Sequence, residues 1–425
     1  MELSVKPKDS IKGEIKVPGD KSISHRAVIF GALARGVTKV HGFLPGEDTW
    51  RTVECFRKMG IDIQREQDLV VIEGKGLKGL QEPEDVLDAG NSGTTARLLM
   101  GLLAGNPFYS VITGDLSLKK RPMDRVVEPL KKMGAVVYGR QGANLLPLTV
   151  MGGNLKGIDY LSPVASAQVK SALLLAGLYA QGTTAVTEPY LSRDHTERMM
   201  KHFGINIKKE ENRVEVEGFP EIEGKRVEVP GDFSSAAYFM VAASLLPGSS
   251  LRILKVGVNP TRTGLLEVLK EMGANITLEK ERIENEEPVA DIKIGYAPLK
   301  GVEIKGDVIP RLIDEIPVLA VAASLAEGET VIREASELRV KESDRIDTME
   351  KELKKMGAKI RGLPDGLVIE GTGELKGAVC ESHGDHRIAM AAAVAGLVAR
   401  GETIIKGRDC INISFPEFPK TLKSL

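Results

Sequence analysis

The sequence is poor in residues that several classes of function depend on. Aromatic residues make up 4% of its 425 residues, which leaves little material for stacking nucleic-acid bases. Its three cysteines, Cys55, Cys380 and Cys410, are too widely spaced for a metal or redox motif, so we expect free thiols in a reducing compartment. The formal net charge is −1, so no general excess of positive charge attracts nucleic acid. We therefore expect no nucleic-acid partner.

Long apolar runs are also missing. The longest uncharged apolar run, 388–399, has 12 residues, whereas a helix needs about 20 to span a bilayer. The first ten residues, MELSVKPKDS, lack the apolar centre of a secretory signal. We expect a cytoplasmic protein that makes no membrane contact.

The sequence does contain an internal repeat. Six segments each run from a polar start into an apolar stretch that ends at a glycine, at positions 36, 105, 182, 248, 328 and 401. These glycines recur every 66–80 residues, which is too regular for chance. After each segment comes a strand-like run, and in the first five an amphipathic helix ending in Met-Gly or Phe-Gly and two more strand-like runs follow. This order of elements predicts an α/β fold of six repeated units.

The length predicts two domains of three units, because six units of about 70 residues exceed one ordinary core. The identical VPGD segments at 17–20 and 229–232 mark the chain crossings, where we expect a hinge. The sixth unit stops without its closing strands, and two short alternating runs in residues 1–17 are expected to complete it. The predicted domains are 20–230 and a discontinuous 1–19 plus 231–425.

The first repeat segment, residues 18–36, predicts an anion site at the start of a buried helix. Ser22 and Ser24 are the expected N-caps, and Gly36 is the expected C-terminal stop. The free backbone N–H groups at such a start, together with Lys21 and Arg26, favour an anionic ligand.

The polar starts of the six segments all differ, although their apolar parts are alike. A repeat scaffold or binding array, the structural alternative, carries similar residues from unit to unit on one face. Individual starts on a common frame favour one composite active site. The cations at or near these starts suit a substrate with several phosphate or carboxylate groups. They are Lys21, Arg26, Arg97, Arg121, Lys341, Arg345 and Arg387.

Several polar residues have a structural alternative of equal standing. Gly93 lets a ligand approach the backbone, but its polar surroundings also fit ordinary helix capping. Ser166 and Gln168 lie at another such start, where the same alternative applies.

His383 and His386 are two potential metal ligands, yet no further ligands accompany them, so we expect no metal.

Two carboxylates are candidates for proton transfer. Asp314 heads a helix bounded by prolines. Its carboxylate either interacts favourably with the helix dipole or acts as a general base. Glu342 stands between Lys341 and Arg345, and the alternative is an exposed charged helix face.

Eight motifs together resemble the enolpyruvyl transferase family over the whole chain. They are PGDKSISHRA, GNSGTTARL, KKRPM, SAQVKSALLLAG, SRDHTE, IDEIPVLAVAA, RVKESDRI and GDHRIAM. The resemblance implies the two-domain fold of that family, an inside-out α/β barrel of six βαβαββ units, three per domain. It also implies transfer of the enolpyruvyl group of phosphoenolpyruvate to the 5-hydroxyl of shikimate 3-phosphate, without metal or organic cofactor. We expect a monomer that binds these two small molecules.

The resemblance also implies roles for individual residues. Asp314 is similar to the base for the attacking hydroxyl, Glu342 to the carboxylate that handles the methylene proton, and Lys21 to a lysine that contacts both substrates. Contacts to shikimate 3-phosphate are implied for Ser22, Arg26, Ser166, Gln168 and Lys341, with Ser192 a weaker candidate. Contacts to phosphoenolpyruvate are implied for Gly93, Arg121, Gln168, Arg345 and Arg387.

The alternative within the family is the sister enzyme whose acceptor is UDP-N-acetylglucosamine. That enzyme has Lys-Asn where this chain has Lys21-Ser22, and a cysteine-bearing loop where this chain has residues 118–122. Both differences favour shikimate 3-phosphate as the acceptor.

Overall fold

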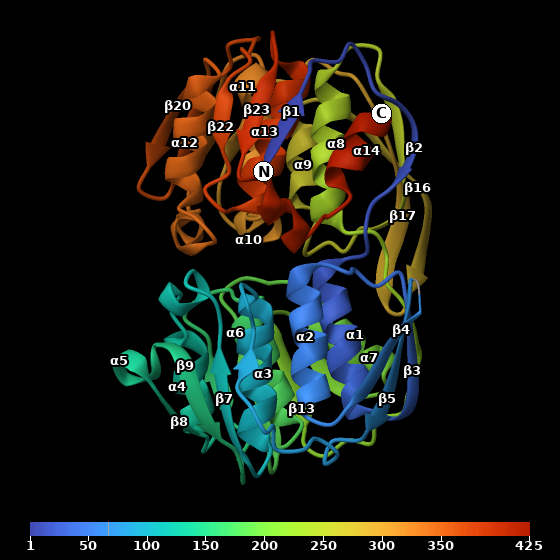
Figure 1. The fold of residues 1–425 in the computed structure, drawn as a ribbon, viewed down its shortest axis with the longest axis vertical. Coiled ribbons are helices and arrows are strands. Elements are labelled where there is room, and N and C mark those ends of the chain that lie inside the picture. The colour runs from blue at the N-terminus through green and yellow to red at the C-terminus, as the bar shows by residue number, and fades with distance from the viewer. Residues whose placement is uncertain (67) are drawn as a thin grey trace. The chain divides into compact units, whose positions relative to one another are not determined.

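The computed structural model describes residues 1–66 and 68–425 (Figure 1). By its internal contacts the chain divides into two compact units. Unit 1 comprises Met1–Pro18, Pro230–Ile283 and Pro288–Leu425, and unit 2 comprises Gly19–Val229 and Glu284–Glu287.

The short segment Glu284–Glu287 differs from the predicted division, which placed it in the second domain. It connects β16 (Asn275–Glu284) to β17 (Glu287–Gly295). Glu286 pairs with Lys201 at 2.7 Å, and Glu287 contacts His195 at 2.8 Å. These partners are distant in sequence, so no local pattern indicated that the segment belongs with unit 2.

Unit 2 contains three four-stranded sheets of one design. Their orders are β14-β3-β5-β4, β6-β7-β9-β8 and β10-β11-β13-β12. In each sheet the first pair of strands is parallel and the other two pairs are antiparallel. The strands are β3 (Arg35–His41), β4 (Asp62–Glu66), β5 (Leu69–Lys75), β6 (Leu87–Asp88), β7 (Tyr109–Thr113), β8 (Val136–Gly139), β9 (Leu145–Met151), β10 (Asp159–Leu161), β11 (Thr183–Thr187), β12 (Ile207–Glu210), β13 (Arg213–Glu217) and β14 (Arg226–Glu228).

Unit 1 contains two four-stranded sheets, β18-β19-β21-β20 and β16-β17-β15-β2, and a three-stranded sheet, β1-β23-β22. The strands not yet given are β1 (Glu2–Val5), β2 (Lys12–Lys16), β15 (Ser250–Gly257), β18 (Glu303–Ile304), β19 (Glu329–Ile332), β20 (Lys359–Leu363), β21 (Gly366–Glu370), β22 (Val379–Glu381) and β23 (Thr403–Lys406).

The two N-terminal strands join different sheets, whereas the sequence predicted that both complete the sixth unit. β1 pairs with β23 as predicted, but β2 pairs in parallel with β15. β2 precedes the chain crossing at Pro18, so it stays in unit 1 and takes the place that β6 and β10 hold in their sheets. β14 does the same in unit 2, where it pairs with β3 before the second crossing. Each crossing therefore leaves a strand in one unit and starts a helix in the other.

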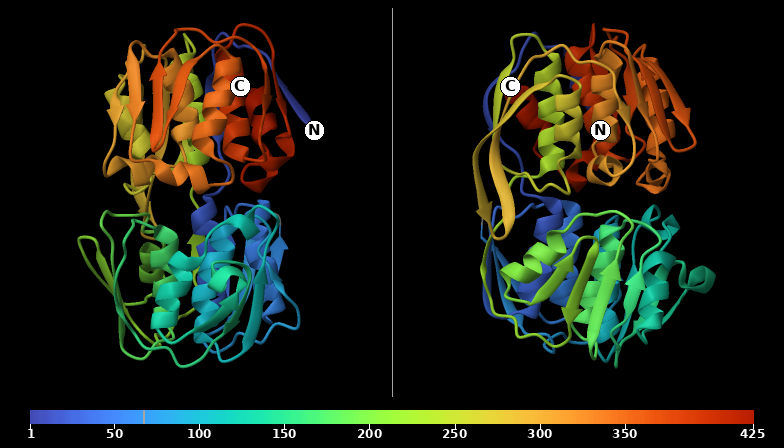
Figure 2. Two further views of the ribbon diagram at one scale, coloured as in Figure 1. Left: turned by 90° about the vertical axis from the view of Figure 1, so that its left-hand side faces the viewer. Right: turned by 180° about the vertical axis from the view of Figure 1, so that it is seen from behind.

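The apolar halves of the repeat segments form helices that are buried almost all round, as an all-apolar helix requires. These are α1 (Lys21–Leu33), α3 (Gly93–Gly105) and α6 (Ala167–Gly177) in unit 2, and α8 (Phe233–Leu245), α11 (Ile316–Leu325) and α13 (His386–Val398) in unit 1. Figure 2 shows strands lying over the helices of each unit. Helices inside and sheets outside confirm the predicted inside-out α/β fold.

The amphipathic helices end where the recurring Met-Gly and Phe-Gly pairs predict. α2 ends at its cap Met59, and Gly60 follows with φ +82°, a left-handed conformation that glycine adopts without steric cost. The same ending occurs at Gly134, Gly204, Gly273 and Gly357. The helices concerned are α2 (Glu47–Lys58), α4 (Asp124–Lys132), α7 (His195–His202), α9 (Gly264–Glu271) and α12 (Arg345–Lys355).

The start of α1 differs from the prediction. Asp20 is the N-cap, and its carboxylate accepts the Ile23 N–H at 2.9 Å. The Ser24 hydroxyl instead accepts the Leu44 N–H, and Gly36 lies within β3 rather than at the helix end. Aspartate caps a helix as well as serine does, so residue preference alone could not choose between them. Lys21 is therefore the first helical residue.

Candidate active site

Unit 2 brings its predicted site residues to the starts of the three buried helices. Lys21, Ser22 and Arg26 lie in the first turns of α1, and Gly93 begins α3. Ser166 caps α6 and Gln168 is in its first turn. Arg121 follows a short 3-10 helix, Leu118–Lys120. Lys21 forms an ion pair with Asp48 of α2 at 3.0 Å, a partner that the sequence analysis did not identify.

Arg26 is buried and held by three neighbours. Its guanidinium donates to the Thr196 hydroxyl at 2.6 Å, the Ser171 hydroxyl at 2.8 Å and the Ser22 carbonyl at 3.0 Å. Burial lowers the pKa of Arg26 to about 10, which still leaves it charged at neutral pH. These bonds connect the start of α1 to α6 and α7.

A buried chain of hydroxyl groups connects α1 to α3. His25 Nδ1 lies 2.7 Å from the Thr52 hydroxyl, which lies 2.7 Å from the Thr95 hydroxyl. The Thr95 hydroxyl in turn donates to Ser92, the N-cap of α3. Burial, and then the positive charges of α1, hold the pKa of His25 well below its usual range. His25 therefore fixes the helix start as a neutral group.

Gly93 lies against two guanidinium groups. A Cβ atom at this position would stand 2.7 Å from Arg97 Nη1 and 3.6 Å from Arg121 Nη1. Arg97 donates to the Gln168 side-chain oxygen at 2.7 Å, and Arg121 donates to the Asn91 side-chain oxygen at 2.7 Å. The two arginines are thus positioned at the N-terminus of α3, an arrangement that suits an anion.

Unit 1 gathers the remaining predicted residues around one carboxylate. Asp314 lies 3.1 Å from Arg345 Nη1, 3.6 Å from Lys341 Nζ and 3.7 Å from Arg387 Nη2. Glu342 pairs with Arg345 Nη2 at 2.6 Å. Arg345 therefore holds both candidate carboxylates on the two ends of one guanidinium group.

Arg345 begins α12, and its side chain is 1% exposed. Burial lowers its pKa, but the charges of Asp385, Glu342 and Asp314 outweigh burial and raise the pKa above its ordinary value. In Arg387, burial lowers the pKa, but Asp314, Tyr238, Glu315 and Asp232 together outweigh burial and raise it. Both guanidinium groups therefore stay charged.

Asp385 is a site residue that the sequence analysis missed. It is fully buried, pairs with Arg345 Nε at 2.8 Å, and accepts the Arg387 N–H at 2.9 Å as the N-cap of α13. Burial and the charge of Glu342 raise the pKa of Asp385, but the charge and hydrogen bond of Arg345, together with His386, outweigh them and hold the pKa below its usual range. An aspartate directly before an apolar helix is a capping signal, which could have marked Asp385 beside His383 and His386.

His383 contacts Glu352 at 2.8 Å. Within residues 1–66 and 68–425, no three His, Cys, Asp or Glu side chains are grouped so that they could hold a metal ion.

The helices described for this chain also include none with the length and apolar character needed to cross a membrane.

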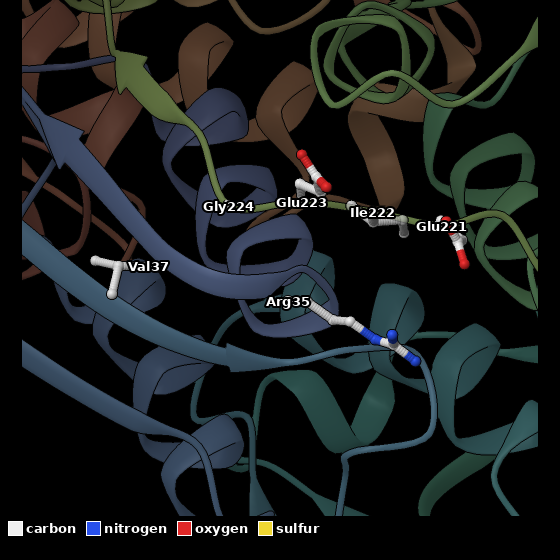
Figure 3. Close-up of a pocket in the computed structure, with 6 residues that line it drawn as sticks. All are labelled: Arg35, Val37, Glu221, Ile222, Glu223 and Gly224. Carbon is white, nitrogen blue, oxygen red and sulfur yellow. The ribbon is translucent and has the colours of Figure 1, made fainter.

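A surface pocket of about 280 Å³ lies in unit 2, and its lining includes none of the predicted site residues (Figure 3). Its lining is Arg35, Val37 and residues 221–224, and the charged side chains among these are exposed. None of the predicted site residues lines it, so it contributes nothing to the candidate active site.

Comparison with known proteins gives one consistent result. The family described as EPSP synthase (3-phosphoshikimate 1-carboxyvinyltransferase) matches residues 5–422. A 3-phosphoshikimate 1-carboxyvinyltransferase of Desulforamulus reducens is 58% identical, over 100% of this chain and 99% of the relative. A 3-phosphoshikimate 1-carboxyvinyltransferase of Pelotomaculum thermopropionicum is 59% identical, over 99% of this chain and 98% of the relative. A solved EPSP synthase structure from Acinetobacter baumannii has a TM-score of 0.89 and 47% identity, and covers 100% of this chain and 97% of that one. The chain therefore belongs to the EPSP synthase (3-phosphoshikimate 1-carboxyvinyltransferase) family.

Proposed function

We propose that this chain transfers the enolpyruvyl group of phosphoenolpyruvate to the 5-hydroxyl of shikimate 3-phosphate and releases phosphate. The observation that carries the proposal is the Arg345 guanidinium, which holds Asp314 and Glu342 at 3.1 Å and 2.6 Å. Addition to a double bond followed by elimination needs a base and an acid close to one another, in a setting that tolerates anions.

The cations and hydrogen-bond donors divide between the two substrates. Shikimate 3-phosphate is bound by Lys21, Ser22, Arg26, Ser166, Gln168, Asp314 and Lys341. Phosphoenolpyruvate is bound by Lys21, Gly93, Arg121, Gln168, Arg345 and Arg387. Both sets consist mainly of groups that neutralise or donate to phosphate and carboxylate oxygens, as two polyanionic substrates require.

In the addition step, Asp314 takes the proton of the acceptor hydroxyl, and the hydroxyl oxygen forms a bond to C2 of phosphoenolpyruvate. Glu342, in its acid form at this step, gives a proton to C3, which becomes a methyl group. The positive charge that develops at C2 is stabilised by the nearby carboxylates.

In the elimination step, Glu342 takes a proton back from the methyl group, the double bond reforms, and the bond between C2 and the phosphate oxygen breaks. The phosphate leaves with the bridging oxygen. Asp314 passes its proton to the solvent or to the leaving phosphate, which leaves Asp314 as a carboxylate and Glu342 in the acid form that it had before the addition.

An acceptor assay tests the proposal. We expect the purified chain to release phosphate from phosphoenolpyruvate with shikimate 3-phosphate, and not with UDP-N-acetylglucosamine. Product analysis by mass spectrometry should show the enolpyruvyl ether of the shikimate acceptor. Turnover with the UDP-sugar alone would refute the proposed acceptor.

Gly93→Ala is expected to raise KM for phosphoenolpyruvate about tenfold, while the unfolding temperature stays near that of wild type. The added methyl group meets the flexible end of Arg97, which can move, but it occupies space beside Arg121 at the start of α3. Gly153→Ala is the matched control, because a Cβ atom there has no neighbour within 4 Å. Steady-state kinetics with each substrate varied checks the prediction, and an unchanged KM for phosphoenolpyruvate would contradict it.

We also propose that residues 17–20 and 229–232 act as a hinge that closes on substrate binding. Small-angle scattering is expected to give a smaller radius of gyration when shikimate 3-phosphate and an unreactive phosphoenolpyruvate mimic are both present. The same radius in both samples would argue against closure.

Two further properties complete the proposal. The chain acts as a monomer in the cytoplasm, where both substrates are expected to be available. Light scattering on the purified protein tests the monomeric state.

A further inference from the structure

A buried group of charges in unit 2 has no role in the mechanism above. Lys170 of α6 has a fully buried side chain and pairs with Glu188 at 2.8 Å and with Glu197 at 2.8 Å. Burial lowers the pKa of Lys170, but the charges of Glu197 and Glu188 outweigh it and raise the pKa above its ordinary value. Lys170 therefore stays charged.

Glu188 also contacts Ser166 of the proposed acceptor site and Ser192, the weaker candidate for that site. Its Oε1 accepts the backbone N–H of Ser166 at 2.9 Å and lies 2.7 Å from the Ser192 hydroxyl, which donates to the carboxylate. Ser166 is the N-cap of α6, and its hydroxyl oxygen accepts the Val169 N–H. That cap uses a lone pair, so the Ser166 hydroxyl proton can be donated to a phosphate oxygen.

A carboxylate beside a phosphate site needs an explanation, because two anions repel one another. The charges nearby balance: Lys170 pairs with Glu188 and Glu197, and Glu197 also acts on Arg26, where its charge opposes the effect of burial on the pKa. Two cations therefore compensate two carboxylates. Glu188 acts as an acceptor for serine donors, and its charge is compensated before any phosphate arrives.

We infer that Glu188 is a positioning residue for the acceptor phosphate. It holds Ser166 at the start of α6 and Ser192 in the loop before α7, so that the two segments stay in register when the phosphate binds. Lys170 pairs with Glu188, and a carboxylate offers acceptor oxygens to both serines. This inference rests on the proposed function, because it takes shikimate 3-phosphate as the ligand.

Glu188→Gln tests the inference. We expect Kd and KM for shikimate 3-phosphate to rise about tenfold or more, because the amide offers one acceptor and a donor that opposes the serine donors. The value of kcat at saturation and KM for phosphoenolpyruvate should stay within about threefold of wild type, since the Arg345 cluster is unchanged. Calorimetry with shikimate 3-phosphate alone gives Kd, and steady-state kinetics gives kcat and the KM for each substrate.

Glu197→Gln is the matched control. It removes a carboxylate from the same lysine but from neither serine, and Lys170 keeps one partner in either variant. We expect this control to bind shikimate 3-phosphate within about threefold of wild type. If Glu188→Gln lowers the unfolding temperature strongly, Glu188→Asp carries the test, because it keeps the charge but is too short to reach both serines.

Several results would overturn the inference. Equal losses of shikimate 3-phosphate affinity in Glu188→Gln and Glu197→Gln would mean that the ionic group only supports the fold. A fall in kcat with unchanged KM, or no change at all, would also refute it. These outcomes differ from failure of the proposed function, in which the wild-type chain itself does not turn over shikimate 3-phosphate.

Discussion

Asp314→Asn is expected to lower kcat by about 10²–10⁴-fold, the range typical of a lost general base. The amide has nearly the shape of the carboxylate but cannot take a proton from the acceptor hydroxyl. Because Lys341, Arg345 and Arg387 remain in place, Kd for shikimate 3-phosphate should change only a few-fold. Rapid-quench measurement of a single turnover separates this loss of chemistry from a change in binding or product release.

Asp307→Asn is a suitable control for this prediction. Asp307 is exposed, lies seven positions before Asp314 in the same segment, and precedes α10 (Val308–Leu312) without a side-chain capping bond. The control should keep wild-type kcat. A near-normal kcat in Asp314→Asn would show that another group accepts the proton.

Arg345→Met is expected to have the second largest effect, on both activity and stability. The substitution removes the cation shared by Asp314, Glu342 and Asp385, so kcat/KM should fall about 10³-fold. It also leaves Asp385 buried without its counter-charge, which is expected to lower the free energy of unfolding by about 3–5 kcal/mol near neutral pH. Arg226→Met, which removes a pair between an exposed arginine and Glu228, should cost less than about 1 kcal/mol.

The stability difference between wild type and Arg345→Met should depend on pH. In wild type, Arg345 holds the pKa of Asp385 below its unfolded value, so this contribution is present above the unfolded pKa and is lost as pH falls through the folded pKa. In the variant the charge of Arg345 is gone, so burial and the charge of Glu342 raise the pKa of Asp385 and penalise the ionised form as pH rises. Chemical denaturation should therefore show a larger difference at about pH 7 than at about pH 4. Equal differences at both values would mean that the buried pair does not stabilise the fold.

The fold was largely predictable because its repeat can be recognised from short sequence patterns within each unit. The all-apolar helix segments recur in all six units, and the glycine after the amphipathic helix recurs in five, so each unit supports the assignment of the others. The place of β2 was not predictable in this way. Its alternating residues fit any sheet edge, and its partner β15 lies more than 200 residues away. The sheet that β2 joins depends on its position before the crossing at Pro18, which places β2 in unit 1.

The site was predictable in its charged residues but not in the residues that hold them. Lys21, Arg345 and Arg387 stand in motifs, whereas their partners Asp48 and Asp385 were not identified. The pair between Arg345 and Asp385 spans 40 residues, and the pair between Lys21 and Asp48 spans 27. Such pairs form because burial makes an uncompensated charge costly, and that condition exists only after the helices pack.

The fate of the oxygen that bridges C2 and phosphorus in phosphoenolpyruvate tests enolpyruvyl transfer most directly. Phosphoenolpyruvate labelled with ¹⁸O at that position is incubated with the wild-type chain and shikimate 3-phosphate, and the released phosphate is examined by phosphorus NMR. Transfer of the enolpyruvyl group breaks the bond between C2 and oxygen, so all of the released phosphate should carry the label. Unlabelled phosphate would mean that the bond between phosphorus and oxygen breaks instead, which would contradict the proposed reaction.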